Sequence, residues 1–294
     1  MSTTTALVTI SESDQAKVRQ WLHNRPETTV RAYEREAWQM LTFIGKPLER
    51  ITLADLQQYQ DELASRGLSL SSQARAVSAI KSLLTFLHRA GLIPANVGAA
   101  VRTRAHPDNL TQRILSETAV QKMLAREDGQ RDHALLRLMY AAGLRASELA
   151  RLCWRDVQER RDKEAGQVTR FGKGGKTISI LVSPETWRVL EALRASETLL
   201  GYGLPDSPVF RSRKHAGHLT TTQVYRIVRA AAKAAGLDAQ VSPHWLRHAH
   251  ASHALDRGAP ISLVQATLGH ASVQTTGRYL HARPDASSGQ YLPV

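Results

Sequence analysis

The chain has 294 residues, and its 39 lysines and arginines against 26 aspartates and glutamates give a formal net charge of +13. This length suffices for two domains with separate cores, and the charge favours a polyanionic partner, although a merely soluble basic protein would show the same balance. The single cysteine, Cys153, excludes an intrachain disulfide and indicates a reducing compartment. No apolar run could span a bilayer and the first ten residues lack a signal-peptide pattern, so we expect a cytoplasmic protein without a membrane partner.

Apolar residues at helical spacing predict four helices in the first hundred residues, at about 11–23, 27–44, 52–65 and 71–89. Thr52 is the expected N-cap of the third helix, and Arg66-Gly67 ends it. Four apolar residues of the fourth helix are expected to point inward, namely Val77, Ile80, Leu84 and Leu87.

The polar face of the fourth helix contains Arg75 and Lys81 and no acidic residue, and Arg31 and Arg35 lie off the apolar stripe of the second helix. Small hydroxyl residues on that face would allow close approach to DNA, where arginine meets phosphate or guanine. An ordinary solvated helix surface has the same composition, and the helix pattern alone favours that simpler interpretation.

Residues 101–113 follow a stretch that breaks the helical pattern, and they are predicted to be a linker. The linker has four basic or histidine residues, Arg102, Arg104, His106 and Arg113, against one acid. It either follows a phosphate backbone or is an ordinary solvated connection. The chain up to Leu110 has 13 basic and 10 acidic residues, or +3, and the remainder has 26 and 16, or +10. Most of the excess charge therefore belongs to the second part.

The second part is predicted to be mostly helical with one small antiparallel sheet. A helix signal at 116–119 is followed by a longer helix that Gly143 ends, and Arg145 begins the next one. Strands are expected at about 156–158, 167–171 and 177–182, the last two joined around Gly174-Gly175. Helices follow at about 184–196, 220–235, 243–256, 260–268 and 272–280.

Two residues three apart, His244 and Arg247, would share one face of the predicted helix at 243–256. An arginine offers a planar fork of donors, and a histidine can donate or accept a proton near neutral pH. The pair is therefore suited to binding a phosphate.

Five motifs together resemble the tyrosine recombinases, also called the phage integrases. They are Gly143-Leu144-Arg145-Ala146-Ser147-Glu148, Gly172-Lys173-Gly174, His244-Trp245-Leu246-Arg247-His248, Leu268-Gly269-His270 and Tyr279. Each motif alone is weak, but all positions are filled and in family order, so the joint match is specific. The resemblance covers the carboxy-terminal two thirds in detail and the rest loosely.

The resemblance implies a mainly α fold. It implies a four-helix, SAM-like core-binding domain at 1–100 that clamps the opposite side of the duplex, a linker at 101–113, and a catalytic domain at 114–294. The family's arm-site binders have a further domain before the first of these. Its absence before Ser11 points to the simpler, Xer-like or transposon-resolving type.

The resemblance also assigns roles. Tyr279 attacks the phosphodiester and forms a 3′-phosphotyrosyl link, although it needs help to lose a proton with a reference pKa near ~10. Arg145 and Arg247 bind the non-bridging oxygens and stabilise the transition state, and Glu148 orients Arg145. Lys173 protonates the leaving 5′ oxygen, with Lys176 as the competing candidate. His244 and His270 are assigned to phosphate binding and to proton handling at Tyr279.

Simpler interpretations exist for some of these residues, because an arbitrary tyrosine in a terminal helix is more often a surface residue. His248, His250 and His253 invite a zinc interpretation, but Trp245 stands where that motif needs glutamate. Helix packing or capping suits these three better. We expect no cofactor, metal or nucleotide, since the arginines supply the positive charge that Mg²⁺ gives other phosphoryl-transfer enzymes.

The predicted function is site-specific DNA recombination for integration, excision or resolution of DNA elements. The expected partners are double-stranded DNA with inverted-repeat core sites and further copies of the chain, forming a tetramer with a Holliday junction as intermediate. The alternative is a sequence-specific DNA-binding regulator that kept the fold and lost the chemistry. The tail at 281–294 is expected either to dock on a neighbouring subunit or to be a frayed end.

Overall fold

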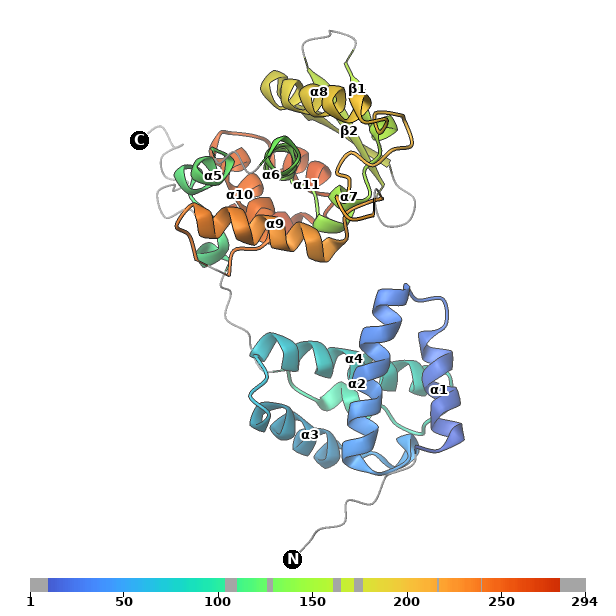
Figure 1. Ribbon diagram of the computed structural model, residues 1–294. Coiled ribbons are helices and arrows are strands. Elements are labelled where there is room, and N and C mark those ends of the chain that lie inside the picture. The colour runs from blue at the N-terminus through green and yellow to red at the C-terminus, as the bar shows by residue number, and fades with distance from the viewer. Residues whose placement is uncertain are drawn as a thin grey trace, which may run out of the picture. The chain divides into compact units, whose positions relative to one another are not determined.

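The computed structural model describes residues 10–103, 110–125, 129–160, 165–171, 177–215, 217–238 and 240–280. The chain forms two compact units, Met1–Pro107 and Asp108–Val294 (Figure 1). The described residues are mostly helical with one small antiparallel sheet, which confirms the predicted fold class. No helix in these ranges is both long and apolar enough to cross a membrane.

Among its described residues, the first unit contains four α-helices that match the predicted ranges to within one residue at each end. They are α1 (Glu12–Leu22), α2 (Glu27–Ile44), α3 (Leu53–Ser65) and α4 (Leu70–Arg89), with short 3₁₀ turns at Leu48–Arg50 and Val97–Ala100.

Local sequence explains where these helices begin and what they bury. Thr52 caps α3 as predicted: its hydroxyl accepts the Asp55 amide at 3.3 Å, and Asp55 accepts the Thr52 amide at 2.9 Å. The apolar faces of α2, α3 and α4 meet in one core, and the four residues expected to point inward from α4 are all buried.

The second unit comprises eight α-helices and three strands among its described residues. These are α5 (Glu117–Leu124), α6 (Gln130–Ala142), α7 (Ala146–Ala150), β1 (Val157–Glu159), β2 (Gly166–Phe171), β3 (Thr177–Val182), α8 (Pro184–Leu199), α9 (Thr221–Ala234), α10 (Pro243–Asp256), α11 (Ile261–Leu268) and α12 (Val273–Gly277), with 3₁₀ turns at Thr111–Arg113 and Trp154–Asp156.

The helix predicted at 272–280 is shorter than expected. It ends at Gly277 instead of continuing to residue 280, so Tyr279 follows the helix in a turn. The Tyr279 amide donates to the carbonyl of Thr276 at 3.1 Å, a three-residue spacing that tightens the chain after the helix. Glycine disfavours continued helix because it loses the most backbone freedom on ordering.

The sheet has the order β1-β2-β3, with both pairs antiparallel. Figure 1 shows α8 beside β1 and β2. Side chains of β2 alternate between buried and less buried positions, and Gly166, Val168 and Arg170 occupy the buried ones. A Cβ on Gly166 would lie 2.0 Å from the Trp187 ring, so glycine allows α8 to approach the sheet closely.

The helices α6 and α10 pack against each other within the main core of the second unit. A smaller apolar cluster joins this region to the start of the unit and to the end of the described chain. Its buried members are Leu110, Ala251, Leu255, Val264, Leu268 and Tyr279. Cys153 is also buried, and burial raises the pKa of its thiol.

Candidate active site

A tight turn between α6 and α7 positions Arg145. Gly143 ends α6 in the left-handed conformation, with φ of +58°, and Arg145 is the N-cap residue of α7. Glu148 holds Arg145 at both ends: one carboxylate oxygen accepts the Arg145 amide at 2.9 Å and the other accepts Nη1 at 2.7 Å. The Arg145 side chain nevertheless remains 40% exposed. Its guanidinium is therefore both oriented and accessible.

Arg247, on α10, connects this turn to the end of α11 through two hydrogen bonds. Its Nη1 donates to the carbonyl of Gly143 and its Nη2 to the carbonyl of Leu268, both at 2.6 Å. The residue is only 4% exposed. Burial, and then the nearby Arg145, lower the pKa of Arg247 to about 10. The guanidinium therefore stays charged at neutral pH, and the two arginines repel unless an anion lies between them.

The hydroxyl of Tyr279 is hydrogen-bonded to His248 Nδ1 at 2.7 Å. Tyr279 is 4% exposed, and burial raises its pKa, while Arg247 and Arg278 act in the opposite direction. Burial lowers the pKa of His248 to about 4, so the ring is neutral near pH 7 and its Nδ1 can accept the phenol proton. Sequence reasoning assigned His248 to packing or capping and missed this contact.

His270 and His244 complete the group. A hydrogen bond of 2.9 Å joins His270 Nδ1 to Thr276 Oγ1, and Thr276 is fully buried. Burial, and then Arg247 and Arg145, lower the pKa of His270 to about 4, and the same causes lower the pKa of His244. The ring of His244 lies 6.3 Å from that of His248. Among these imidazoles, His248 is the one bonded to the phenol.

Arg170 is a further charged residue of the site that sequence reasoning missed. It is 2% exposed, and its Nη1 donates to the same Glu148 oxygen that accepts Arg145 Nη1, at 2.7 Å. Its Nη2 donates to the carbonyl of Thr267 at 3.1 Å. The alternation of inward and outward side chains along β2 could have indicated this role. It places Arg170 at a buried position, and a buried arginine requires a partner.

The structure thus brings together Arg145, Arg247, His244, His270 and Tyr279, five of the six predicted catalytic residues. The sixth, Lys173, lies outside the described residues, as do Lys176 and the tail at 281–294.

Two further histidines of α10 bind α6. His250 Nδ1 donates to the carbonyl of Tyr140 at 2.8 Å, and His253 Nδ1 is bonded to the Tyr140 hydroxyl at 2.9 Å. Within the described part of the chain, no group of three or more His, Cys, Asp or Glu residues is arranged to hold a metal ion. These two side chains therefore connect helices.

The four predicted DNA-contacting residues of the first unit all have protein partners. Arg31 pairs with Glu27, and Lys81 Nζ donates to the carbonyl of Val101 at 2.7 Å. Arg35 and Arg75 share Glu36, at 2.9 and 3.5 Å. Helix α4 has no acid on its polar face, but α2 places Glu36 beside it. The arginines are exposed, so their ion pairs are weak and can be exchanged for other anions.

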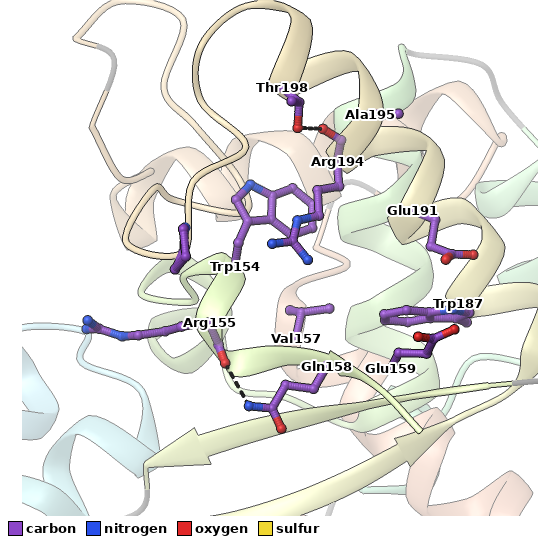
Figure 2. A pocket seen from close by; sticks show the side chains of 11 residues that line it. Trp154, Arg155, Val157, Gln158, Glu159, Trp187, Glu191, Arg194, Ala195 and Thr198 are labelled. Carbon is purple, nitrogen blue, oxygen red and sulfur yellow. Dashed lines mark hydrogen bonds between the residues drawn. The ribbon is translucent and has the colours of Figure 1, made fainter. Parts of the chain in front are cut away.

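A separate pocket of about 620 Å³ lies between β1, α8 and the segment after α8 (Figure 2). Figure 2 shows Arg194 over the Trp154 ring, and the guanidinium carbon lies 5.6 Å from the ring centroid. Glu159, Glu191 and Trp187 form another part of the wall. None of the predicted site residues is among those lining it, so it is distinct from the arginine and histidine cluster.

Two known families match the chain. Residues 112–285 match the Phage integrase family, and residues 17–91 match the Phage integrase, N-terminal SAM-like domain. The first match covers more than half of the chain and spans every motif from Arg145 to Tyr279.

Curated relatives extend over most of the sequence. Tyrosine recombinase XerD of Vibrio cholerae serotype O1 is 31% identical over 283 residues, covering 91% of this chain and 92% of that protein. Tyrosine recombinase XerC of Xanthomonas campestris pv. campestris is 34% identical over 260 residues, covering 86% and 78%.

Solved structures share the fold at lower identity. A lambda integrase(75-356) dimer bound to a COC′ core site has a TM-score of 0.73 at 19% identity, covering 93% of this chain and 95% of that one. XerH site-specific recombinase bound to difH substrate has a TM-score of 0.70 at 18% identity, covering 97% and 90%. Taken with the site geometry, these matches confirm the predicted resemblance, and the chain belongs to the phage integrase family.

Proposed function

We propose that this chain is a site-specific DNA recombinase that cuts and rejoins DNA strands by transesterification at phosphorus. The observation that carries the proposal is the convergence of Arg145, Arg247, His244 and His270 on the region of Tyr279. Together with Tyr279 they come from four places in the second unit: the start of α7, α10, the end of α11 and the turn after α12. The curated relatives that span most of the chain are named tyrosine recombinases.

The two arginines act on the scissile phosphate. Arg145 and Arg247 bind its non-bridging oxygens and stabilise the negative charge that grows as phosphorus becomes pentacoordinate. Burial is the main cause of the lowered pKa of Arg247 and repulsion by Arg145 is the second, and this repulsion is relieved when an anion lies between the two arginines. The site therefore binds the transition state more strongly than the ground state.

The phenol of Tyr279 is the nucleophile, and its proton must leave as the bond to phosphorus forms. His248 Nδ1 is hydrogen-bonded to the phenol hydroxyl, which makes it the candidate acceptor of that proton. The displaced deoxyribose oxygen takes a proton from Lys173. The product is a 3′-phosphotyrosyl bond, which a second DNA strand reverses by attack of its free 5′ hydroxyl.

The substrate is double-stranded DNA with inverted-repeat core sites, and the active assembly is a tetramer acting through a Holliday junction. Support comes from a fold neighbour described as a lambda integrase tetramer bound to a Holliday junction, and from the net charge of +13. The reaction needs no nucleotide or metal, and it takes place in the cytoplasm.

A nicked suicide substrate tests the proposal against the regulator alternative. Wild-type protein should form a covalent adduct with DNA, whereas Tyr279→Phe should form none and still bind the same DNA. Tyr225→Phe is a matched control, because Tyr225 is a partly buried tyrosine packed on the core, and it should retain the adduct. Sequence-specific binding without any wild-type adduct would support the regulator.

A further inference from the structure

The carboxylate of Glu148 is shared by two guanidiniums. One oxygen, Oε1, accepts both Arg145 Nη1 and Arg170 Nη1, each at 2.7 Å. A carboxylate paired with a single arginine would neutralise it, whereas a carboxylate shared by two leaves one net positive charge. Arg145 is the exposed member and Arg170 the buried one, so that remaining charge is available at Arg145.

The second contact of Arg170 reaches the turn that carries His270. The last two carbonyls of α11 accept different arginines: Thr267 accepts Arg170 Nη2 at 3.1 Å, and Leu268 accepts Arg247 Nη2 at 2.6 Å. Cations at a helix carboxyl end are favoured by the helix dipole. Two guanidiniums from different elements thereby hold the turn immediately before His270.

The glycine between this helix and His270 makes room for Arg170. Gly269 has φ of +62°, and a Cβ built there would lie 2.2 Å from Arg170 Nη2. The conformation and the space both require glycine. The Leu-Gly-His motif therefore needs its glycine in this chain partly because the guanidinium of Arg170 occupies the adjacent position.

We propose that Arg170 is a positioning residue for the reaction described above. Through Glu148 it orients Arg145 toward the scissile phosphate and preserves its charge, and through Thr267 it fixes the turn before His270. A planar fork with two separate donors suits this arrangement, and lysine provides a single point donor that cannot hold both partners. This inference rests on the proposed recombinase function.

The test compares Arg170→Met and Arg170→Lys with wild type in single-turnover cleavage of a suicide substrate. One substrate has an ordinary scissile phosphate, and the other has a methylphosphonate, which replaces a charged non-bridging oxygen with a methyl group. If Arg170 acts through Arg145, Arg170→Met should slow cleavage of the ordinary phosphate about 10- to 100-fold. The loss should shrink several-fold on the neutral substrate, where less charge needs stabilisation. Arg170→Lys should lie between Arg170→Met and wild type.

A double-mutant cycle adds a second readout. In an Arg145→Ala background, changing Arg170 should produce little further loss on the ordinary phosphate, because the residue through which it acts is already gone. Equal losses on both substrates, or a full additional loss without Arg145, would show that Arg170 serves the fold alone and would overturn the proposal.

Controls separate this outcome from general damage and from failure of the recombinase proposal. Arg211→Met removes another largely enclosed ion pair, with Glu197, elsewhere in the second unit, and it should leave cleavage of both substrates near wild type. Melting temperatures of all variants identify any that unfold, and Arg170→Lys retains the buried charge if Arg170→Met does not fold. Absence of a wild-type adduct would contradict the recombinase function itself, whereas normal wild-type cleavage with unaffected Arg170 variants would contradict only the positioning role.

Discussion

The hydroxyl of Tyr279 illustrates how burial and reactivity are balanced at a single residue. The ring packs in an apolar cluster, and burial raises the pKa of the phenol. Burial also lowers the pKa of His248 to about 4, which keeps its Nδ1 free to accept a hydrogen bond. The two shifts favour a neutral pair at rest, so the proton moves only when the phenolate oxygen gains a partner in phosphorus.

Replacement of His248 should slow covalent adduct formation without weakening DNA binding. We expect His248→Leu to reduce the single-turnover cleavage rate about 10- to 100-fold, because it removes the acceptor that orients the phenol. His248→Asn should be less impaired, since its amide oxygen can accept the same hydrogen bond. Gel electrophoresis of the covalent adduct formed on a suicide substrate measures these cleavage rates. A wild-type rate in His248→Leu would show that His248 takes no part in the reaction.

Thr276 provides a similar test for His270. Thr276→Val keeps the shape of a fully buried side chain but leaves His270 Nδ1 without its hydroxyl partner. We expect a loss of roughly 1 kcal/mol in the free energy of unfolding and a several-fold slower cleavage, because the imidazole is no longer held in one orientation. Thr276→Ser retains the hydroxyl and should cleave faster than Thr276→Val. Identical cleavage rates in these two variants would contradict the assigned role.

At the scale of secondary structure, the site depends on where helices end. Helices α6 and α11 both end at a left-handed glycine, Gly143 and Gly269, and a reacting residue follows each within two positions. The carbonyls at these ends accept hydrogen bonds from Arg247. Helix termination thus aligns Arg145, Arg247 and His270 before any DNA is present.

Gly143→Ala should destabilise the fold considerably more than Gly236→Ala, although both glycines have a left-handed conformation. A Cβ at Gly143 would lie 2.7 Å from Leu268 Cδ2 and 2.8 Å from His250 Cδ2, whereas a Cβ at Gly236, also at positive φ, would contact nothing within 4 Å. We expect Gly236→Ala to reduce the free energy of unfolding by about 1 kcal/mol. Gly143→Ala should lose at least ~1 kcal/mol more, because the overpacked contact adds to the strain. Urea denaturation measures both, and equal losses would contradict the steric argument.

Most elements were predictable because their signals are local. The apolar stripe of α4, the Thr52 cap of α3 and the Gly143 stop of α6 each depend on residues within a few positions of one another. The predicted extension of the last helix to residue 280 was wrong because it ignored Gly277 and the tight turn at Thr276.

The site was predictable only in its motif residues. Arg145, Arg247 and Tyr279 stand in recognisable sequence contexts, whereas Arg170 and His248 act through contacts 22 and 31 residues distant along the chain. Such contacts depend on how β2 and α12 fold back on α7 and α10, which local patterns do not specify. Lys173 remains a prediction from its motif.

At the scale of the whole molecule, the positive charge should govern DNA affinity. We expect the logarithm of the binding constant to fall linearly with the logarithm of salt concentration, because phosphate contacts release counterions. Arg31→Ala and Arg35→Ala should each weaken binding similarly for all sequences and reduce the salt slope by about one. Arg66→Ala, at the end of α3, removes a comparable exposed arginine outside the predicted DNA face and is the control. An unchanged slope in the first two variants would exclude them from the interface.

The histidines of the second unit should make its stability depend on pH. The pKa values of His248, His250 and His270 are each lowered to about 4, chiefly by burial, against a reference value near ~6.5. The unfolded chain therefore takes up protons that the folded chain does not between these values. The contribution of these histidines to the free energy of unfolding is fully present above about pH 6.5 and is lost as the pH falls toward 4.

His250→Asn tests this dependence, because its amide can still donate to the carbonyl of Tyr140. We expect the loss of unfolding free energy between pH 7.5 and pH 5 to become smaller by on the order of 1 kcal/mol in this variant. Chemical denaturation at the two pH values provides the measurement. An unchanged pH dependence would show that His250 is protonated to the same extent in the folded and unfolded states.

Cys153 gives the second unit an internal reporter. It is the single cysteine of the sequence, it is buried, and its raised pKa keeps it in the unreactive thiol form. A thiol reagent should consequently modify the native protein only as fast as the region around Cys153 opens, so the labelling rate measures local or global unfolding. Accelerated labelling in any variant discussed above would separate a loosened fold from a defect confined to chemistry.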